Sequence, residues 1–110
     1  MNQSIEQYSV YWVDLNPTKG AEINKIRPCV VISPFEMNEN LRTIIIAPVT
    51  SRGREGYPTS SKMAVNDIEG WIVLDQIRSI DKSRLCDMIG NLSTEEIMAV
   101  KNIIKEMLVD

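Results

Sequence analysis

Histidine is absent from this sequence of 110 residues. Its absence excludes a Ser-His-Asp triad, a Cys-His dyad and a pair of histidines acting as acid and base. Cysteine occurs only at Cys29 and Cys86, which is too few for a disulfide scaffold and, without histidine, for a structural zinc site. We interpret both cysteines as core residues, because free cysteine is among the most buried residue types. Any catalysis must therefore use arginine, lysine, carboxylates, hydroxyls or backbone amides.

The sequence also lacks features of exported, membrane-bound and DNA-coating proteins. Residues 1–7 are polar, without the basic start and apolar centre of a signal peptide, and the longest apolar runs are far shorter than a membrane span. We therefore expect a cytoplasmic protein without membrane contact. The formal net charge of −3 argues against non-specific coating of DNA, although it allows a local basic surface.

The composition is that of an ordinary globular domain. Hydrophobic residues make up 44% of the chain and charged residues 25%, and a chain of this length can bury one real core. No internal repeat or linker interrupts it. The sequence therefore predicts a single domain over residues 1–110.

Two strongly apolar runs, residues 29–32 and 44–49, are typical of neighbouring buried strands. Arg27 stands just before the first run, and Thr50 just after the second. If these strands are antiparallel, the start of one lies beside the end of the other. We therefore expect a fixed positive charge and a hydroxyl to meet at one rim of a sheet.

The remaining chain predicts further strands, one helical turn and one terminal helix. Strands are expected over residues 8–15, 62–65, 71–78 and 84–91, a helical turn over 35–40, and a loop over 51–61. Ser93 and Glu96 form the pattern of a capping box that opens a helix. One face of that helix is apolar, through Ile97, Val100, Ile104, Met107 and Leu108. The pattern predicts a mostly β fold, a small barrel with a C-terminal amphipathic helix.

Arg27 and the hydroxyls of Thr50 and Ser51 are the first candidates for chemistry. A guanidinium is always charged, and its planar fork matches a phosphate or a carboxylate. Arg27 could instead be a structural residue that pairs with Glu22 or Asp75. The hydroxyls could hydrogen-bond a phosphate, or they could simply close a turn.

A second group of candidates is basic or aromatic and lies in or beside predicted loops. Its members are Lys19, Lys25, Arg52, Arg54 and Lys62, with Trp12 and Tyr57. The basic residues could line a phosphate backbone while the aromatic rings stack on unpaired bases, or they could form an ordinary solvated surface. Trp71 heads an apolar strand and is expected in the core. The polar stretch 75–78 interrupts that strand, which indicates either a functional surface or a half-exposed strand.

The order and spacing of several motifs resemble one known family. The motifs are WVDLNPTKGAE at residues 12–22, RPCVVIS at 27–33, APVTS at 47–51, GYP at 56–58 and DQIRSID at 75–81. Together they are similar to the MazF/PemK, or Kid-like, toxins of bacterial toxin–antitoxin systems. The resemblance covers nearly the whole chain.

The resemblance implies a small SH3-like barrel that forms a homodimer. It implies an endoribonuclease that needs no metal or other cofactor and cuts single-stranded RNA at short motifs, leaving 2′,3′-cyclic phosphate and 5′-hydroxyl ends. The partners implied are mRNA, a cognate antitoxin and, only together with that antitoxin, operator DNA. Arg27, Thr50 and Glu22 match the family's catalytic positions, and Asp75 and Gln76 match positions near the RNA. With these two, the expected RNA-binding residues are Lys19, Lys25, Ser51, Arg52, Arg54, Tyr57 and Arg78.

Three other functions compete with RNA cleavage. Toxins of the CcdB type share this barrel but inhibit DNA gyrase by binding it, and fold alone does not separate the two activities. A second alternative is a degenerate family member kept only for antitoxin or operator binding. A third is an SH3-like module with an aromatic peptide groove, which an aromatic content of 5% disfavours. The pairing of Arg27 with Thr50 favours RNA cleavage.

Overall fold

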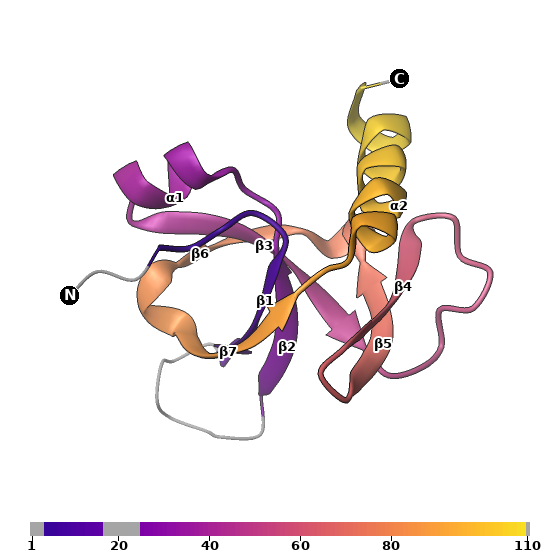
Figure 1. The fold of residues 1–110 in the computed structure, drawn as a ribbon, viewed down its shortest axis with the longest axis horizontal. Coiled ribbons are helices and arrows are strands. Elements are labelled where there is room, and N and C mark those ends of the chain that lie inside the picture. The colour runs from indigo at the N-terminus through magenta and orange to yellow at the C-terminus, as the bar shows by residue number, and fades with distance from the viewer. Residues whose placement is uncertain (1–3, 17–24, 110) are drawn as a thin grey trace.

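The computed structural model describes residues 4–16 and 25–109 as a curled β-sheet flanked by two helices (Figure 1). The strands are β1 (Ser9–Asp14), β2 (Ile26–Val31), β3 (Thr43–Thr50), β4 (Ser60–Val65), β5 (Ile68–Val73), β6 (Arg78–Asp81) and β7 (Leu85–Asn91). The helical elements are α1 (Phe35–Asn40), η1 (Leu74–Gln76), η2 (Lys82–Arg84), α2 (Thr94–Ile104) and η3 (Lys105–Val109). The predicted mostly β fold with a C-terminal helix is confirmed.

The sheet has the strand order β4-β5-β3-β2-β1-β7, and every pairing is antiparallel. β3 is its central strand. One edge of β3 pairs with β2, and its other edge is divided between β5 and β6. β3 therefore joins the two parts of the curled sheet, which Figure 1 shows as strands running in different directions.

The predicted single strand over residues 71–78 is wrong. On β3, Val49 pairs with Ile72 and Ile46 pairs with Arg78. The segment from Ile72 to Arg78 is therefore longer than the segment of β3, from Ile46 to Val49, that lies beside it. The surplus forms the short 3₁₀ turn η1 between β5 and β6. Leu74 in this turn is fully buried, so the apolar pattern continues through it. The hydrophobic pattern of residues 71–78 therefore resembles that of an unbroken strand.

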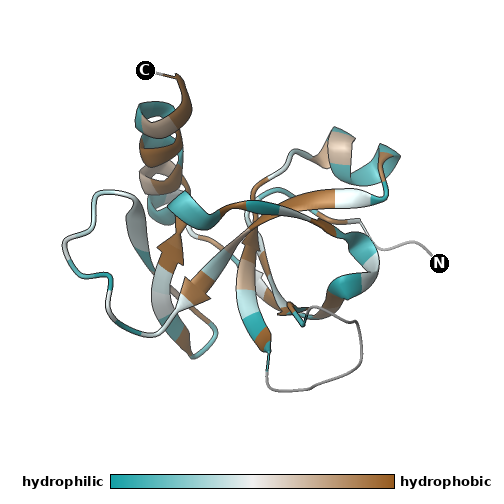
Figure 2. Ribbon diagram, turned by 180° about the vertical axis from the view of Figure 1, so that it is seen from behind, coloured by the Kyte–Doolittle hydropathy of each residue, from teal (hydrophilic) through white to brown (hydrophobic). Residues whose placement is uncertain are grey.

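The core consists of two apolar clusters on opposite faces of β1, β2 and β3. Val30 and Ala47 belong to the cluster beneath α2, whereas Cys29, Val31 and Ile46 belong to the other. This alternation follows from the period of two residues in a strand. Figure 2 shows the strands as largely hydrophobic and the connection from β3 to β4 as hydrophilic.

Helix α2 begins at the predicted capping box. The Ser93 hydroxyl accepts a hydrogen bond from the Glu96 amide, and the Glu96 carboxylate accepts one from the Ser93 amide. Val100 is buried, and Ile97, Ile104 and Met107 pack against the same core cluster. Leu108 is instead 63% exposed, because it lies in the π-helical turn of η3, which follows α2 and departs from the α-helical period. No helix in the described part of the chain is long and apolar enough to cross a membrane.

The two cysteines lie in different environments. Cys29 is fully buried in β2, as predicted, but Cys86 is exposed on β7, so the expectation that both are core residues is wrong. β7 is the edge strand beside β1, and the residues around Cys86 face solvent. Trp71 is also less buried than expected: its ring is half-buried and lies 5.8 Å from the Lys62 ammonium.

Only Cys86 is expected to react with a thiol reagent in the folded protein. Burial raises the pKa of the Cys29 thiol to about 12, and the thiolate is the reactive form. Titration with a chromogenic disulfide at about pH 8 should find one fast thiol in the native protein and two after unfolding. The Cys86→Ser variant should show no fast thiol when native. Two fast thiols in the native wild-type protein would contradict the burial of Cys29.

Candidate nucleic-acid interface

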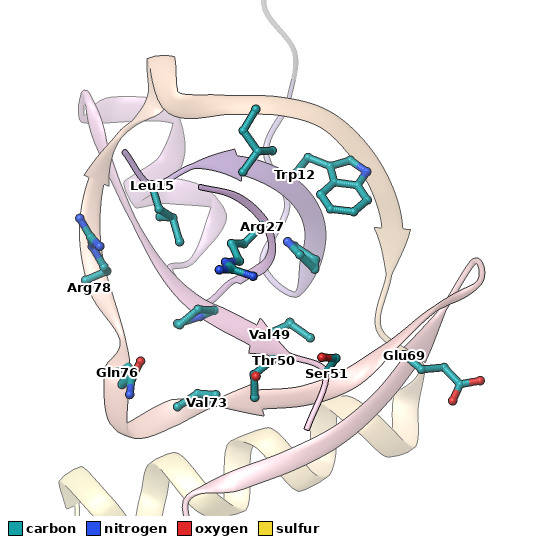
Figure 3. A pocket seen from close by; sticks show the side chains of 13 residues that line it. Trp12, Leu15, Arg27, Val49, Thr50, Ser51, Glu69, Val73, Gln76 and Arg78 are labelled. Atoms are coloured by element: carbon teal, nitrogen blue, oxygen red, sulfur yellow. The ribbon is translucent and has the colours of Figure 1, made fainter. Parts of the chain in front are cut away.

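A pocket of about 560 Å³ opens where β1, β2, β3 and the β5–β6 segment meet. Figure 3 shows the Arg27 side chain near its centre. The pocket is lined by Trp12, Leu15, Ile26, Arg27, Pro28, Pro48, Val49, Thr50, Ser51, Glu69, Val73, Gln76 and Arg78. One part of the wall is apolar and the other carries guanidinium, hydroxyl and amide groups.

Arg27 and Thr50 meet in this pocket because β2 and β3 are antiparallel. Cys29 pairs with Pro48, so continuing the same register by two residues brings Arg27 opposite Thr50. Both side chains line the pocket. The expected juxtaposition of a guanidinium and a hydroxyl at one rim of the sheet is therefore present.

The Arg27 guanidinium is exposed in the pocket and makes no ion pair with a carboxylate of the described residues. Asp75, one of its two predicted structural partners, is bound by Arg54 instead. Glu22, the other partner, lies outside the described residues, as does Lys19. Within the described chain, the arginine is therefore available to an anionic ligand.

Thr50 lies at the end of β3, where the chain enters the loop over residues 51–59. Its hydroxyl donates a hydrogen bond to the Arg52 carbonyl at 3.3 Å. This weak bond closes a turn, and the same residue lines the pocket. Turn closure and a position in the site are therefore compatible for Thr50. Behind Thr50, β5 approaches so closely that a Cβ atom on Gly70 would lie 2.5 Å from the Thr50 carbonyl oxygen.

The charge lining the pocket is positive, although the chain as a whole has a formal net charge of −3. Arg27 and Arg78 contribute two guanidinium groups, and Glu69 contributes one carboxylate. Figure 3 shows the Glu69 carboxylate directed away from Arg27. Arginine forks beside an apolar wall suit a ligand that combines phosphate with a flat base.

The predicted RNA-binding residues divide into two groups. Ser51, Gln76 and Arg78 line the pocket, whereas Lys25, Arg52 and Tyr57 are exposed outside it. Arg54 and Asp75 do not line it and bind one another. The lining residues that sequence reasoning did not name as site residues are Leu15, Ile26, Pro28, Pro48, Val49, Glu69 and Val73. Ile26 and Pro28 flank Arg27 in the sequence and Val49 precedes Thr50, so their positions were the available signal. No cluster suited to a metal ion occurs within residues 4–16 and 25–109.

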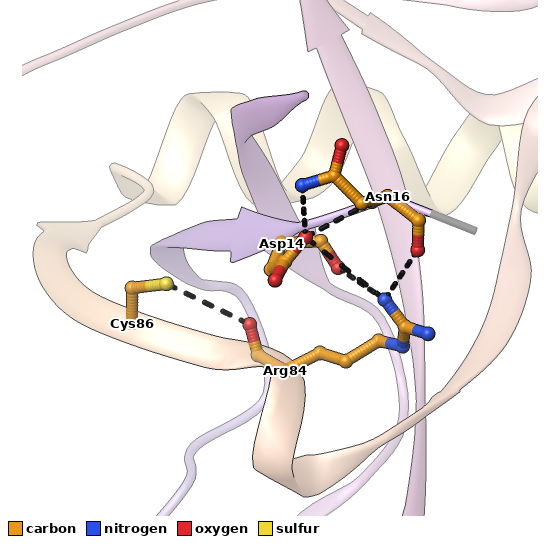
Figure 4. A network of polar contacts seen from close by, with 4 residues as sticks. All are labelled: Asp14, Asn16, Arg84 and Cys86. Atoms are coloured by element: carbon orange, nitrogen blue, oxygen red, sulfur yellow. Dashed lines mark hydrogen bonds and ion pairs between the residues drawn. The ribbon is translucent and has the colours of Figure 1, made fainter. Parts of the chain in front are cut away.

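A polar network fixes the end of β1 beside the pocket (Figure 4). Arg84 donates hydrogen bonds to the backbone oxygens of Asp14 and Asn16, at 3.0 and 2.6 Å. The Asp14 carboxylate accepts from the amide and side chain of Asn16, at 3.0 and 2.6 Å. The network holds the chain on both sides of Leu15 and so helps to shape the pocket wall.

The sequence and fold agree with one family. A family profile described as PemK-like, MazF-like toxin of type II toxin–antitoxin system matches residues 6–108. This chain belongs to that family. Among its relatives, the endoribonuclease toxin MazF of Escherichia coli is 34% identical over 91 residues, which cover 82% of this chain and 81% of the relative. The endoribonuclease MazF of Staphylococcus saprophyticus is 35% identical, covering 86% and 83%.

Solved structures of MazF toxins share the fold. The crystal structure of MazF from Deinococcus radiodurans has a TM-score of 0.80 at 26% identity, covering 97% of this chain and 98% of that one. An endoribonuclease from a mycobacterial species, solved with its cognate antitoxin, has a TM-score of 0.80 at 20% identity, covering 94% of each chain. Family and relatives favour an endoribonuclease toxin over a gyrase-binding toxin of the CcdB type.

Proposed function

We propose that this MazF-like toxin is a metal-independent endoribonuclease that cleaves single-stranded mRNA at a short sequence motif. The observation that carries the proposal is the meeting of Arg27 and Thr50 in one pocket beside an apolar wall. The guanidinium suits the scissile phosphate, and the wall suits an unpaired base. The MazF relatives that are named endoribonucleases support the same conclusion.

The proposed reaction is an in-line attack of the ribose 2′-oxygen on the adjacent phosphorus. A P–O2′ bond forms and the P–O5′ bond breaks, which leaves a 2′,3′-cyclic phosphate and a 5′-hydroxyl. The 2′-hydroxyl loses its proton, and the departing 5′-oxygen gains one. Arg27 stabilises the negative charge that develops on the phosphorane, and Thr50 donates a hydrogen bond to a non-bridging oxygen. We propose Glu22 as the base that takes the 2′-proton.

The decisive experiment is cleavage of a long single-stranded RNA by the purified protein in EDTA, with Arg27→Ala in parallel. Cut sites are read by primer extension, and the new ends are identified chemically. We expect discrete cuts with 2′,3′-cyclic phosphate ends that disappear in the variant. No cutting by the folded wild-type protein would contradict the proposal and direct the next assay to gyrase supercoiling.

Replacing Thr50 by valine is expected to lower the cleavage rate about 100-fold, because valine keeps the branched shape but removes the hydroxyl donor. Thr50→Ser should keep most of the activity. Single-turnover rates on one RNA substrate measure both variants, and melting temperatures close to wild type confirm that they fold. Equal activity of the valine and serine variants would show that the Thr50 hydroxyl has no role in cleavage.

We also propose a cytoplasmic homodimer that a cognate antitoxin inhibits and that binds operator DNA only together with that antitoxin. Support for the antitoxin comes from the mycobacterial endoribonuclease solved in complex with its own. The proposed mRNA substrate supports the cytoplasmic location. Equilibrium sedimentation tests the dimer, and a monomer at micromolar concentration would contradict it.

A further inference from the structure

The loop between β3 and β4 is attached to the turn η1 by a compact set of contacts. The loop spans residues 51–59 and contains two glycines in the left-handed region, Gly53 with φ 87° and Gly56 with φ 80°. Its last residue, Thr59, accepts a backbone hydrogen bond from Leu74 at 3.0 Å. The Thr59 hydroxyl donates to the Asp75 carboxylate at 2.7 Å. The end of the loop is therefore held against η1 by both backbone and side chain.

Arg54 is the centre of these contacts. Only 16% of its side chain is exposed. Its Nε donates to the Ser60 hydroxyl at 2.9 Å, and its Nη2 pairs with the same Asp75 oxygen that Thr59 contacts. The guanidinium also lies 4.3 Å from the centre of the Tyr57 ring. The nitrogen donors and one face of the Arg54 guanidinium are thus engaged within the protein. A guanidinium engaged in this way is poorly suited to binding RNA.

The Asp75 carboxylate is the group on η1 that Arg54 and Thr59 of the loop contact. The hydrogen bond from Thr59 and the neighbouring Arg54 guanidinium hold the pKa of Asp75 below its ordinary value. The carboxylate is therefore ionised at neutral pH and engaged with the loop. The next residue, Gln76, lines the pocket, and the preceding residue, Leu74, is fully buried. The direction of the Gln76 side chain therefore depends on how Leu74 and Asp75 are held.

We propose that Arg54 is a positioning residue that clamps the 51–59 loop to η1 and so fixes the part of the pocket that selects an RNA base. The selecting group is the Gln76 amide, which carries both a donor and an acceptor for an unpaired base edge. Ser51 faces the same pocket from the start of the loop. This inference rests on the proposed ribonuclease function and deepens it.

The test compares Arg54→Ala, Asp75→Ala and the double variant. The substrates are short RNAs built on the strongest wild-type cut site, with each flanking base replaced in turn. Selectivity is the ratio of kcat/KM for the original base to that for the replaced base. We expect each single variant to reduce this ratio about tenfold at one position. The double variant should be no worse, because both residues belong to one clamp.

Two comparisons separate positioning from direct binding. A lost phosphate contact would reduce the slope of log kcat/KM against log salt by about 0.7, whereas a clamp leaves the slope unchanged. Arg42→Ala is the matched control, because it also removes one arginine and one ion pair, with Asp81 at 3.7 Å, from a side chain that is 90% exposed. It should leave selectivity unchanged.

Several results would overturn the inference. A reduced salt slope in Arg54→Ala would show direct contact with RNA, and stronger RNA binding by Asp75→Ala would show that the pair withholds Arg54 from RNA. Abolished cleavage in Asp75→Ala alone would place the carboxylate in the chemistry. Lower melting temperatures with unchanged selectivity would leave only a structural role. If wild-type protein does not cut RNA at all, the proposed function fails, and this inference fails with it.

Discussion

Replacing Arg27 by lysine is expected to lower the rate of RNA cleavage about 100- to 1,000-fold, nearly as much as replacement by alanine. Lysine keeps the charge but is a point donor without the planar fork that binds two phosphate oxygens at once. The register between β2 and β3 also fixes the position of the residue 27 backbone. A lysine ammonium at this position therefore cannot regain the lost contact by a movement of the backbone. Single-turnover kinetics on the wild-type cut site measure the effect.

The loss should reflect chemistry rather than folding. Arg27 is exposed and pairs with no described carboxylate, so Arg27→Lys should melt at nearly the wild-type temperature. Arg42→Lys, the same change at an exposed site outside the pocket, should cleave RNA at the wild-type rate. If Arg27→Lys also cleaves at that rate, the bidentate role of the guanidinium is wrong.

Replacing Gly70 by alanine is expected to reduce both stability and cleavage. The added Cβ would lie 2.5 Å from the Thr50 carbonyl oxygen and 2.8 Å from Val49 Cγ1. Backbone must therefore move, and overpacking of this kind costs about 1–3 kcal/mol of the free energy of unfolding. Because the displaced residue is Thr50, we also expect the cleavage rate of the folded fraction to fall at least about tenfold.

Gly90→Ala provides the matched control for Gly70→Ala. Its Cβ would lie 2.7 Å from Val65 Cγ1 and 2.8 Å from Asn66 Nδ2, so it is also crowded, but by side chains outside the pocket. Urea unfolding should show a smaller loss of stability, and the folded fraction should cleave at the wild-type rate. Wild-type stability of Gly70→Ala would contradict the close approach of β5 to β3.

Local sequence was sufficient for the features that depend on neighbouring residues. Apolar runs indicated β2 and β3, and their antiparallel pairing brought Arg27 to Thr50. The spacing of Ser93 and Glu96 indicated the start of α2. The catalytic roles of Arg27, Thr50 and Glu22 stay predictions.

Features that depend on distant parts of the chain were missed. The break at η1 exists because β3 shares one edge between two strands, and buried Leu74 conceals it in the hydrophobic pattern. Cys86 is exposed because β7 is an edge strand, which a local pattern does not show. Arg54 appeared to be a free loop arginine, since its partner Asp75 lies on another element.

The pairing of β1 with β7 has a consequence for the synthesis of this toxin. Ser9 on β1 pairs with Asn91 on β7. β1 leaves the ribosome early, and one of its edges stays unpaired until β7 has been made. Gln76 and Arg78 reach the pocket only after most of the chain has been made. An open strand edge is a template for pairing with other chains, so the growing toxin carries an aggregation hazard until late in translation. The pocket is likewise incomplete in a partly made chain until Gln76 and Arg78 have been added.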